Sequence, residues 1–300
     1  MPNLMNDFAF KYVFGADDIY SNNALKGMLE TFLERRIESV QLKNPEMTKD
    51  IENMKNPIFD ILVRFDDSVQ VDVEMQVFVD LDELKERTIY YCTRLHASQD
   101  LKGMPYSSAD KSIVLSILNG NLFDDLDCFH TVNMYTDKGE LFSDAIGLYF
   151  VELKKLKESK SNAELDNKEQ LVYYFLNCQN KQTNSRIKEM VENNEVIQMI
   201  DERVDQIEED RWKKLNDDFV AFHQNEREVR IKKAEDKAKA EGRAEGKAEG
   251  LAEGRTEGLA QGREEGIVDT IKALSKTMPI ETIALALNKT KSEIEDLLNK

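Results

Sequence analysis

The sequence predicts an α/β core that continues into a long helical extension. Apolar residues recur at three- and four-residue steps near the N-terminus, alternate with a period of two over residues 58–78, and return to helical spacing after residue 81. The second half of the chain is almost entirely helical in pattern and rich in charge. An order of helix, strand-rich segment and helix favours a sheet covered by helices.

Taken in order, the pattern predicts six elements in the first half of the chain. They are a helical segment over residues 7–40, a β-hairpin over 58–78, a helix over 81–101, short buried strands over 113–118 and 145–153, and a loop over 158–162. Residues 165–240 continue as charged helices with apolar steps. The strand-rich part is therefore confined to roughly the first 155 residues.

Composition excludes several classes of protein. Hydrophobic residues make up 41% of the 300 residues, enough to bury a core, and 33% are charged. The formal charge of -17 excludes a uniformly basic nucleic-acid coat, although not a local basic groove. No segment reads as a signal peptide or a membrane span. Three isolated cysteines, Cys92, Cys128 and Cys178, favour buried reduced thiols over a zinc site, so we expect a cytoplasmic protein without membrane association.

The register of the hairpin follows from matching its apolar faces. Residues 66–68, Asp-Asp-Ser, form a plausible turn because Asp tolerates left-handed backbone angles. A two-residue turn would set Ile61 opposite Asp72 and mix the two faces. A three-residue turn instead builds one wholly apolar face from the pairs Phe65–Val69, Val63–Val71, Ile61–Val73 and Phe59–Met75, leaving Ile58 and Leu62 as the apolar residues of the other face.

On that second face the same register places Asp60 directly opposite Glu74, with Gln76 two residues further along. Opposed side chains have Cβ atoms about 4.5–5.5 Å apart, so two carboxylates there repel unless a cation lies between them. Mg²⁺ prefers carboxylate and carbonyl oxygens with water, and it polarises a phosphoryl oxygen and lowers the pKa of bound water. The face therefore suggests a one- or two-metal hydrolytic site, the alternative being an ordinary solvated polar face.

These residues resemble a known family. Asp60, followed fourteen residues later by Glu74-Met75-Gln76, is similar to the core motif of the PD-(D/E)XK nuclease superfamily, and within it to the recombination-promoting nuclease and putative transposase family. Further blocks resemble that family in order and spacing over about residues 5–155: Asp7–Gly15 (D-x-x-F-K), Asp72–Gln76 (E-x-Q), Arg87–Tyr91, Gln99, Gly103 and Phe150–Lys154.

The resemblance implies a restriction-endonuclease-like mixed sheet flanked by helices, and metal-dependent cleavage of DNA. It assigns Asp60, Glu74 and the backbone carbonyl of Met75 to Mg²⁺, or to another divalent cation such as Ca²⁺ or Mn²⁺, and it implies no organic cofactor. Gln76 stands where the superfamily usually has Lys. Because glutamine orients water only by hydrogen bonds, the general base stays open between substrate phosphate and bulk water.

Two more residues of these blocks are candidates for the site. Asp7 would complete the acidic cluster from the first helix, the alternative being a helix N-cap at the surface. Arg87 would contact phosphate or the rim of the site, the alternative being a salt bridge to one of its acidic neighbours.

Glycine recurs at every fourth position from 242 to 266. Glycine inside a helix costs about 1 kcal/mol relative to alanine, but the intervening Ala, Glu, Lys and Arg are good helix formers. Residues four apart drift by about 40° per repeat, so the glycines form a bare stripe along which two backbones could approach closely. We expect an oligomerisation helix here; a flexible tether and an edge strand are the alternatives.

The expected organisation has four parts: a nuclease core over residues 1–155, a helical extension over 156–238, the repeat over 239–266 and a small helical unit over 267–300. The last unit has five lysines and five acidic residues, which favours a helical end cap over a DNA-reading helix-turn-helix. The expected function is that of a Mg²⁺-dependent DNA endonuclease, a phosphodiester hydrolase in recombination, transposition-like processes or defence, which assembles as a homo-oligomer through the repeat.

The alternative is a catalytically inactive nuclease-fold protein that acts by DNA binding or self-assembly. Residues 1–155 contain 27 acidic and 16 basic residues, a net charge of -11. Any DNA contact in this part must therefore rely on bound metal and a local basic patch.

Overall fold

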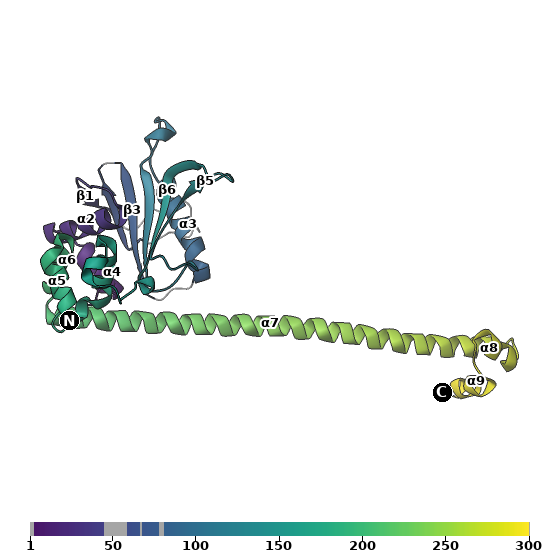
Figure 1. The fold of residues 1–300 in the computed structure, drawn as a ribbon. Coiled ribbons are helices and arrows are strands. Elements are labelled where there is room, and N and C mark those ends of the chain that lie inside the picture. The colour runs from purple at the N-terminus through teal and green to yellow at the C-terminus, as the bar shows by residue number, and fades with distance from the viewer. Residues whose placement is uncertain (1–2, 45–58, 67, 78–80, 300) are drawn as a thin grey trace. The chain divides into compact units, whose positions relative to one another are not determined.

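The computed structural model describes residues 3–44, 59–66, 68–77 and 81–299, and the chain forms two compact units, residues 1–223 and 224–300 (Figure 1). Ile58 and Asp67, which belong to the predicted hairpin, lie outside the described residues. Each unit has its own buried apolar core.

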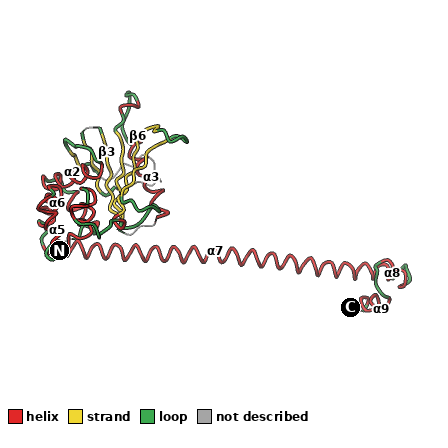
Figure 2. Tube along the Cα trace, viewed as in Figure 1, coloured by secondary structure: helices red, strands yellow, loops and turns green. Residues whose placement is uncertain are grey.

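The first unit contains a mixed sheet of six strands in the order β1-β2-β3-β4-β6-β5 (Figure 2). The strands are β1 (Val40–Leu42), β2 (Ile61–Phe65), β3 (Val69–Gln76), β4 (Lys111–Leu118), β5 (Phe129–Tyr135) and β6 (Leu141–Glu152). β3, β4 and β6 are parallel to one another, whereas the pairs at the two edges of the sheet are antiparallel. The predicted fold class, a mixed sheet flanked by helices with a long helical C-terminal extension, is confirmed.

The register predicted for the hairpin is confirmed for its regular part. The pairs of β2 and β3 include Phe65–Val69, Val63–Val71 and Ile61–Val73. Asp66 has a φ of 51°, the left-handed conformation for which aspartate is suited at a turn. Apolar pairs buried on one side fix the register, because a shift by one residue would turn every side chain to the other face.

The N-terminal helical segment is divided in two, which the apolar spacing alone does not reveal. α1 (Asp7–Phe14) ends at Gly15, whose N–H donates to the Lys11 carbonyl, and α2 (Ile19–Leu33) begins after Asp18. The Asp18 side chain accepts hydrogen bonds from the first backbone N–H groups of α2 and so fixes its start. Residues 40–42 form β1, so the prediction of helix up to residue 40 was too long.

Helices cover both faces of the sheet. One face carries the main core, to which α1, α2, α4 (Asn167–Asn177), α5 (Ser185–Asn193) and α6 (Glu195–Asp205) contribute buried side chains. α3 (Leu81–Ala97) packs on the opposite face over β4 and β6 (Figure 1). Short 3₁₀ turns occur at Tyr106–Ser108, Leu153–Lys155, Asn162–Glu164 and Cys178–Asn180. All three cysteines are free and buried, as predicted.

The strand-rich part is larger than predicted at its far edge. β5 was missed, and β6 begins at Leu141 rather than at residue 145. β5 is an edge strand whose residues are at most partly buried, so it lacks the clean alternation that marks a half-buried strand. Edge pairing with β6 creates this strand without a strong local signal.

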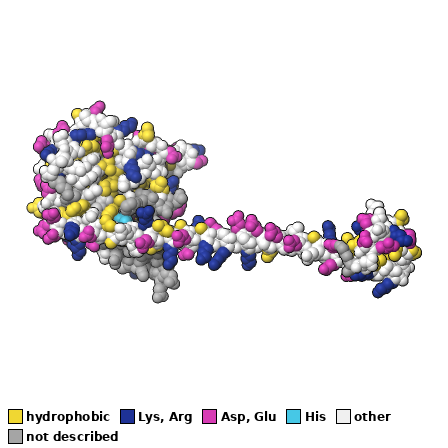
Figure 3. Space-filling view, turned by 90° about the horizontal axis from the view of Figure 1, so that it is seen from below, with side chains coloured by type: hydrophobic (Ala, Val, Ile, Leu, Met, Phe, Trp, Pro, Cys, Tyr) yellow, Lys and Arg dark blue, Asp and Glu magenta, His cyan; other side chains and the backbone are white. Residues whose placement is uncertain are grey.

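α7 (Glu209–Leu274) is one continuous helix that includes all seven repeat glycines. The edge-strand alternative for the repeat was therefore wrong. Both acidic and basic side chains line the exposed part of this helix (Figure 3). No helix within the described ranges is long and apolar enough to cross a membrane.

The second unit has a small buried core of its own. The end of α7 packs with α8 (Ile280–Ala286) and α9 (Lys291–Leu298) around Ile271, Ile283, Ala284 and Ile294. Thr290 and Glu293 form a capping box at the start of α9. Asn288, in the turn between the two short helices, has a φ of 52°.

Candidate active site

The structure brings Asp60 and Glu74 into contact. Asp60 immediately precedes β2, and Glu74 lies two residues before the end of β3. The backbone N–H of Asp60 donates to Glu74 Oε1 at 3.2 Å, and the N–H of Met75 donates to Asp60 Oδ2 at 3.2 Å. Each carboxylate is thus held by the backbone of the opposite strand, which orients both groups without neutralising their charge.

Gln76 and Arg87 both interact with the Oε2 atom of Glu74. The Gln76 amide donates to Glu74 Oε2 at 2.8 Å, and Arg87 Nη2 on α3 lies 3.8 Å from the same oxygen. Arg87 therefore pairs with an acidic residue of the site itself. Burial and, next, the charge of Asp60 raise the pKa of Glu74 to about 8, although Arg87 opposes the shift.

Asp72 is a third acidic residue, which sequence reasoning missed as a site residue. It is fully buried, and neither carboxylate oxygen has a hydrogen-bond partner in the part of the chain that the structure describes. Burial first, and then the charges of Glu74 and Asp60, raise its pKa well above the ordinary range. The period of two already puts Asp72 on the same face as Glu74, so the signal was present in the sequence.

Helix α1 adds two charged side chains at this end of the hairpin. Lys11 Nζ lies 2.6 Å from Asp60 Oδ1. Asp7 is not the N-cap, because the Asn6 side chain accepts the hydrogen bond from Ala9 N–H instead; that alternative was wrong. Burial raises the pKa of Asp7, which interacts electrostatically with Lys11 and Asp60 and lies 3.8 Å from His223 Nε2 of α7.

The chemistry of this donor set fits a hard divalent cation. Carboxylate oxygens are its preferred ligands, and a buried carboxylate pair without full compensation is an unfavourable arrangement unless a cation or proton is supplied. Among the described residues, no three His, Cys, Asp or Glu side chains are gathered into a complete metal site. Mg²⁺ usually takes only one or two carboxylates from the protein and completes its shell with water and substrate phosphate.

Other residues of the family-like blocks have structural roles. The Gln99 side chain accepts from Asp110 N–H at 2.6 Å and donates to the Asp110 carbonyl, which fixes the chain just before β4. Gly103 has a φ of 77°, which favours glycine. Buried Glu152 accepts backbone N–H groups of Leu122 and Phe123 and pairs with Lys155 at 2.9 Å.

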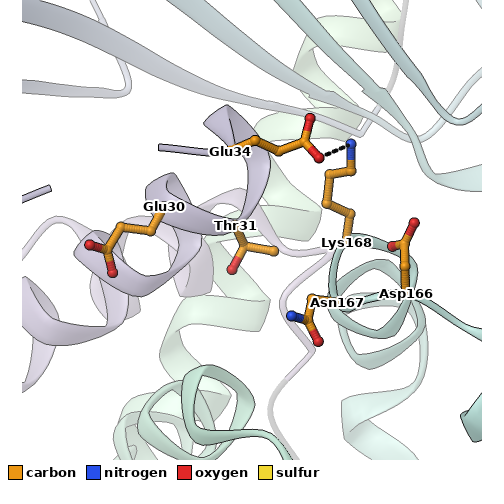
Figure 4. A pocket seen from close by; sticks show the side chains of 6 residues that line it. All are labelled: Glu30, Thr31, Glu34, Asp166, Asn167 and Lys168. Atoms are coloured by element: carbon orange, nitrogen blue, oxygen red, sulfur yellow. Dashed lines mark ion pairs between the residues drawn. The ribbon is translucent and has the colours of Figure 1, made fainter. Parts of the chain in front are cut away.

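A pocket between α2 and α4 has a volume of about 410 Å³, and its charged lining side chains take part in ion pairs or hydrogen bonds of the fold (Figure 4). Lys168 pairs with Glu34 at 3.1 Å, Glu30 accepts from Ile37 N–H, and Asp166 caps α4. These side chains stabilise the fold. The acidic cluster at the hairpin is therefore the better candidate site.

The structure thus combines a mixed sheet with an Asp–Glu pair at its hairpin, the arrangement that the resemblance to PD-(D/E)XK nucleases led us to expect. The family model of the PD-(D/E)XK nuclease family transposase matches residues 4–234, and the chain belongs to this family. Neither the curated proteins nor the solved structures compared with the chain give a match. Family membership indicates a nuclease-type function with DNA as the substrate class.

Proposed function

We propose that this protein is a metal-dependent DNA endonuclease that hydrolyses phosphodiester bonds in recombination, transposition-like processes or defence. The observation that carries the proposal is the mutual backbone anchoring of Asp60 and Glu74, beside a buried Asp72 without a hydrogen-bond partner among the described residues. Such a cluster of buried acids is costly to the fold, which is typical of residues retained for function rather than stability.

In this proposal Asp60 and Glu74, with the Met75 carbonyl, hold Mg²⁺ or another divalent cation such as Mn²⁺ or Ca²⁺. The bound cation would polarise the scissile phosphate and lower the pKa of an attacking water molecule. Gln76 keeps Glu74 in one orientation through its 2.8 Å hydrogen bond. Arg87, on α3, offsets part of the negative charge of the acidic cluster, which lets a phosphate approach.

Plasmid nicking by the full chain tests this function. In Mg²⁺ or Mn²⁺, wild type should convert supercoiled DNA to nicked or linear forms, whereas Asp60→Asn and Glu74→Gln should lose at least about 100-fold in rate. Asp144→Asn is the matched control, because Asp144 is an exposed carboxylate that pairs with Lys111. Equal cleavage by wild type and Asp60→Asn would refute the site.

A direct binding measurement separates catalysis from metal binding. Calorimetric titration with Mn²⁺ should show binding to wild type and to Asp144→Asn, and a loss of at least tenfold in affinity for Asp60→Asn. Metal binding without any DNA cleavage would instead favour the second candidate, a nuclease-fold protein that acts by DNA binding or self-assembly. The observation that favours this second candidate is the glutamine at position 76, where the superfamily usually has lysine.

We also propose that α7 assembles copies of the chain through its glycine stripe. A Cβ added at any of the seven repeat glycines would meet no atom within 4 Å. The glycines are thus not required by packing within one chain, and they cost helix stability. Analytical ultracentrifugation of the full chain and of residues 1–238 tests the idea: if the full chain sediments as a monomer, as the truncated chain should, the proposal is contradicted.

A further inference from the structure

We propose that Lys11 provides the positive charge that Gln76 cannot provide at this site. In this role the Lys11 ammonium lies beside Asp60, hydrogen-bonds the attacking water and offsets charge on the scissile phosphate. The inference rests on the proposed nuclease function and assigns that reaction a further catalytic residue, from a helix that precedes the hairpin in the sequence.

The contact is short and comes from a firmly placed helix. Lys11 Nζ lies 2.6 Å from Asp60 Oδ1. On the other side of α1, Phe10, Val13 and Phe14 are fully buried in the main core, and the helix ends at Gly15. At Gly15 an added Cβ would lie 2.8 Å from the Lys11 carbonyl, so this helix end needs glycine. The backbone that carries Lys11 is therefore fixed by packing.

The exposure of Lys11 suits contact with a substrate. Its side chain is 44% exposed and that of Asp60 is 17% exposed, so the ammonium stands between the acidic cluster and the solvent. Arg87 approaches from α3 and contacts Glu74, while its guanidinium carbon lies 5.8 Å from the Tyr91 ring centre. The two cations therefore pair with different carboxylates: Arg87 with Glu74, and Lys11 with Asp60.

The surplus of carboxylates around the site gives the Lys11–Asp60 contact a function beyond that of a salt bridge. Four carboxylates interact electrostatically with one another or with Lys11: Asp7, Asp60, Asp72 and Glu74. The lysine and arginine side chains that offset them are Lys11 and Arg87. An ion pair whose lysine is 44% exposed contributes little to stability by itself. A lysine on a flexible stem can, however, move between a carboxylate and an incoming phosphate, which the planar guanidinium fork of Arg87 does less readily.

A complementation experiment tests the proposal in the full chain. Lys11→Met should lower kcat for plasmid nicking by about 100-fold with KM changed less than about threefold. Combined with Lys11→Met in a double variant, Gln76→Lys should recover at least a tenfold part of the lost activity, because a lysine at position 76 supplies the missing positive charge. Lys11→Arg, which keeps the charge, should remain within about tenfold of wild type. Lys26→Met, a change on α2, is the matched lysine control.

A second readout does not depend on activity. Because the ammonium competes with a cation for Asp60, Lys11→Met should bind Mn²⁺ at least as tightly as wild type in calorimetric titration, and its circular dichroism spectrum should be unchanged. Loss of both metal binding and activity in Lys11→Met would overturn the proposal, since it indicates a merely structural role. Full activity of Lys11→Met, or no rescue by Gln76→Lys, would overturn it as well. An inactive wild type would refute the proposed function itself, and so the two failures are distinguishable.

Discussion

The side-chain amide of Gln76 donates a 2.8 Å hydrogen bond to Oε2 of Glu74, two residues earlier on the same face of β3. The amide thereby orients a carboxylate that its own strand neighbour, Asp72, repels electrostatically. At the position where related nucleases usually have lysine, this chain has a residue that positions the acidic pair and carries no charge.

Gln76→Ala should therefore reduce cleavage moderately. A hydrogen bond to a charged group contributes roughly 1.5–3 kcal/mol, so we expect a loss of about ten- to hundredfold in kcat/KM, smaller than that of Glu74→Gln. Steady-state nicking assays compare the two variants. Gln70→Ala, a change elsewhere on β3, is the control and should be neutral. An unaffected Gln76→Ala enzyme would show that Glu74 needs no such orientation.

Stability without metal should fall as the pH rises. The folded-state pKa of Glu74 is raised from its ordinary value to about 8, so between about pH 4.5 and 8 the folded chain binds more protons than the unfolded chain. The free energy of unfolding then decreases with pH across this window, and Asp72 adds a loss of the same sign. Urea denaturation in EDTA at pH 5, 6.5 and 8 measures the slope.

Glu74→Gln should flatten that slope, because the amide does not titrate. Saturating Mg²⁺ should raise stability most at pH 8, where wild type needs a cation most. Lys11, Asp60 and Arg87 face the same carboxylates and remain unchanged in this variant. A stability that rises with pH in EDTA would contradict the raised pKa of Glu74.

Replacing repeat glycines should separate helix stability from assembly. Gly250→Ala with Gly254→Ala should stabilise the isolated helix by about 1 kcal/mol per site, since each added Cβ meets open space within one chain. If two backbones approach along the stripe, the same methyl groups should weaken association. Circular dichroism and sedimentation of the full chain follow the two effects. Lys247→Ala is the control that favours helix and leaves the stripe intact; stronger association of the glycine variant would refute close approach.

The C-terminal unit should unfold independently after a single core truncation. Ile294 is fully buried in a small core whose other buried members, among the residues that the structure describes, are Ile271, Ile283 and Ala284. Ile294→Ala should cost about 2–5 kcal/mol, which exceeds what so small a core can supply. Hydrogen exchange should then lose protection in α8 and α9 while the sheet keeps its own. Leu285→Ala, at a residue 86% exposed, is the matched control.

Local patterns predicted those elements whose residues alternate cleanly between buried and exposed. The hairpin of β2 and β3 is one case, because burial of alternate residues on one face admits a single register. β5 is the opposite case: it lies at the sheet edge, buries little, and depends on β6 for pairing. The division between α1 and α2 depends on Gly15 and on the cap at Asp18, two signals that apolar spacing does not contain.

The sequence by itself determined that Asp60 and Glu74 meet, because the period of two and a turn of three residues leave no other apolar register. It also placed Gln76 and Asp72 on the face of Glu74. Only the tertiary structure decided which cations reach these acids. Lys11 arrives on α1 from the side of the main core, and Arg87 arrives on α3 from the opposite face. Helix packing sets those positions, and packing depends on contacts between residues distant in sequence, which periodicity along one segment cannot encode.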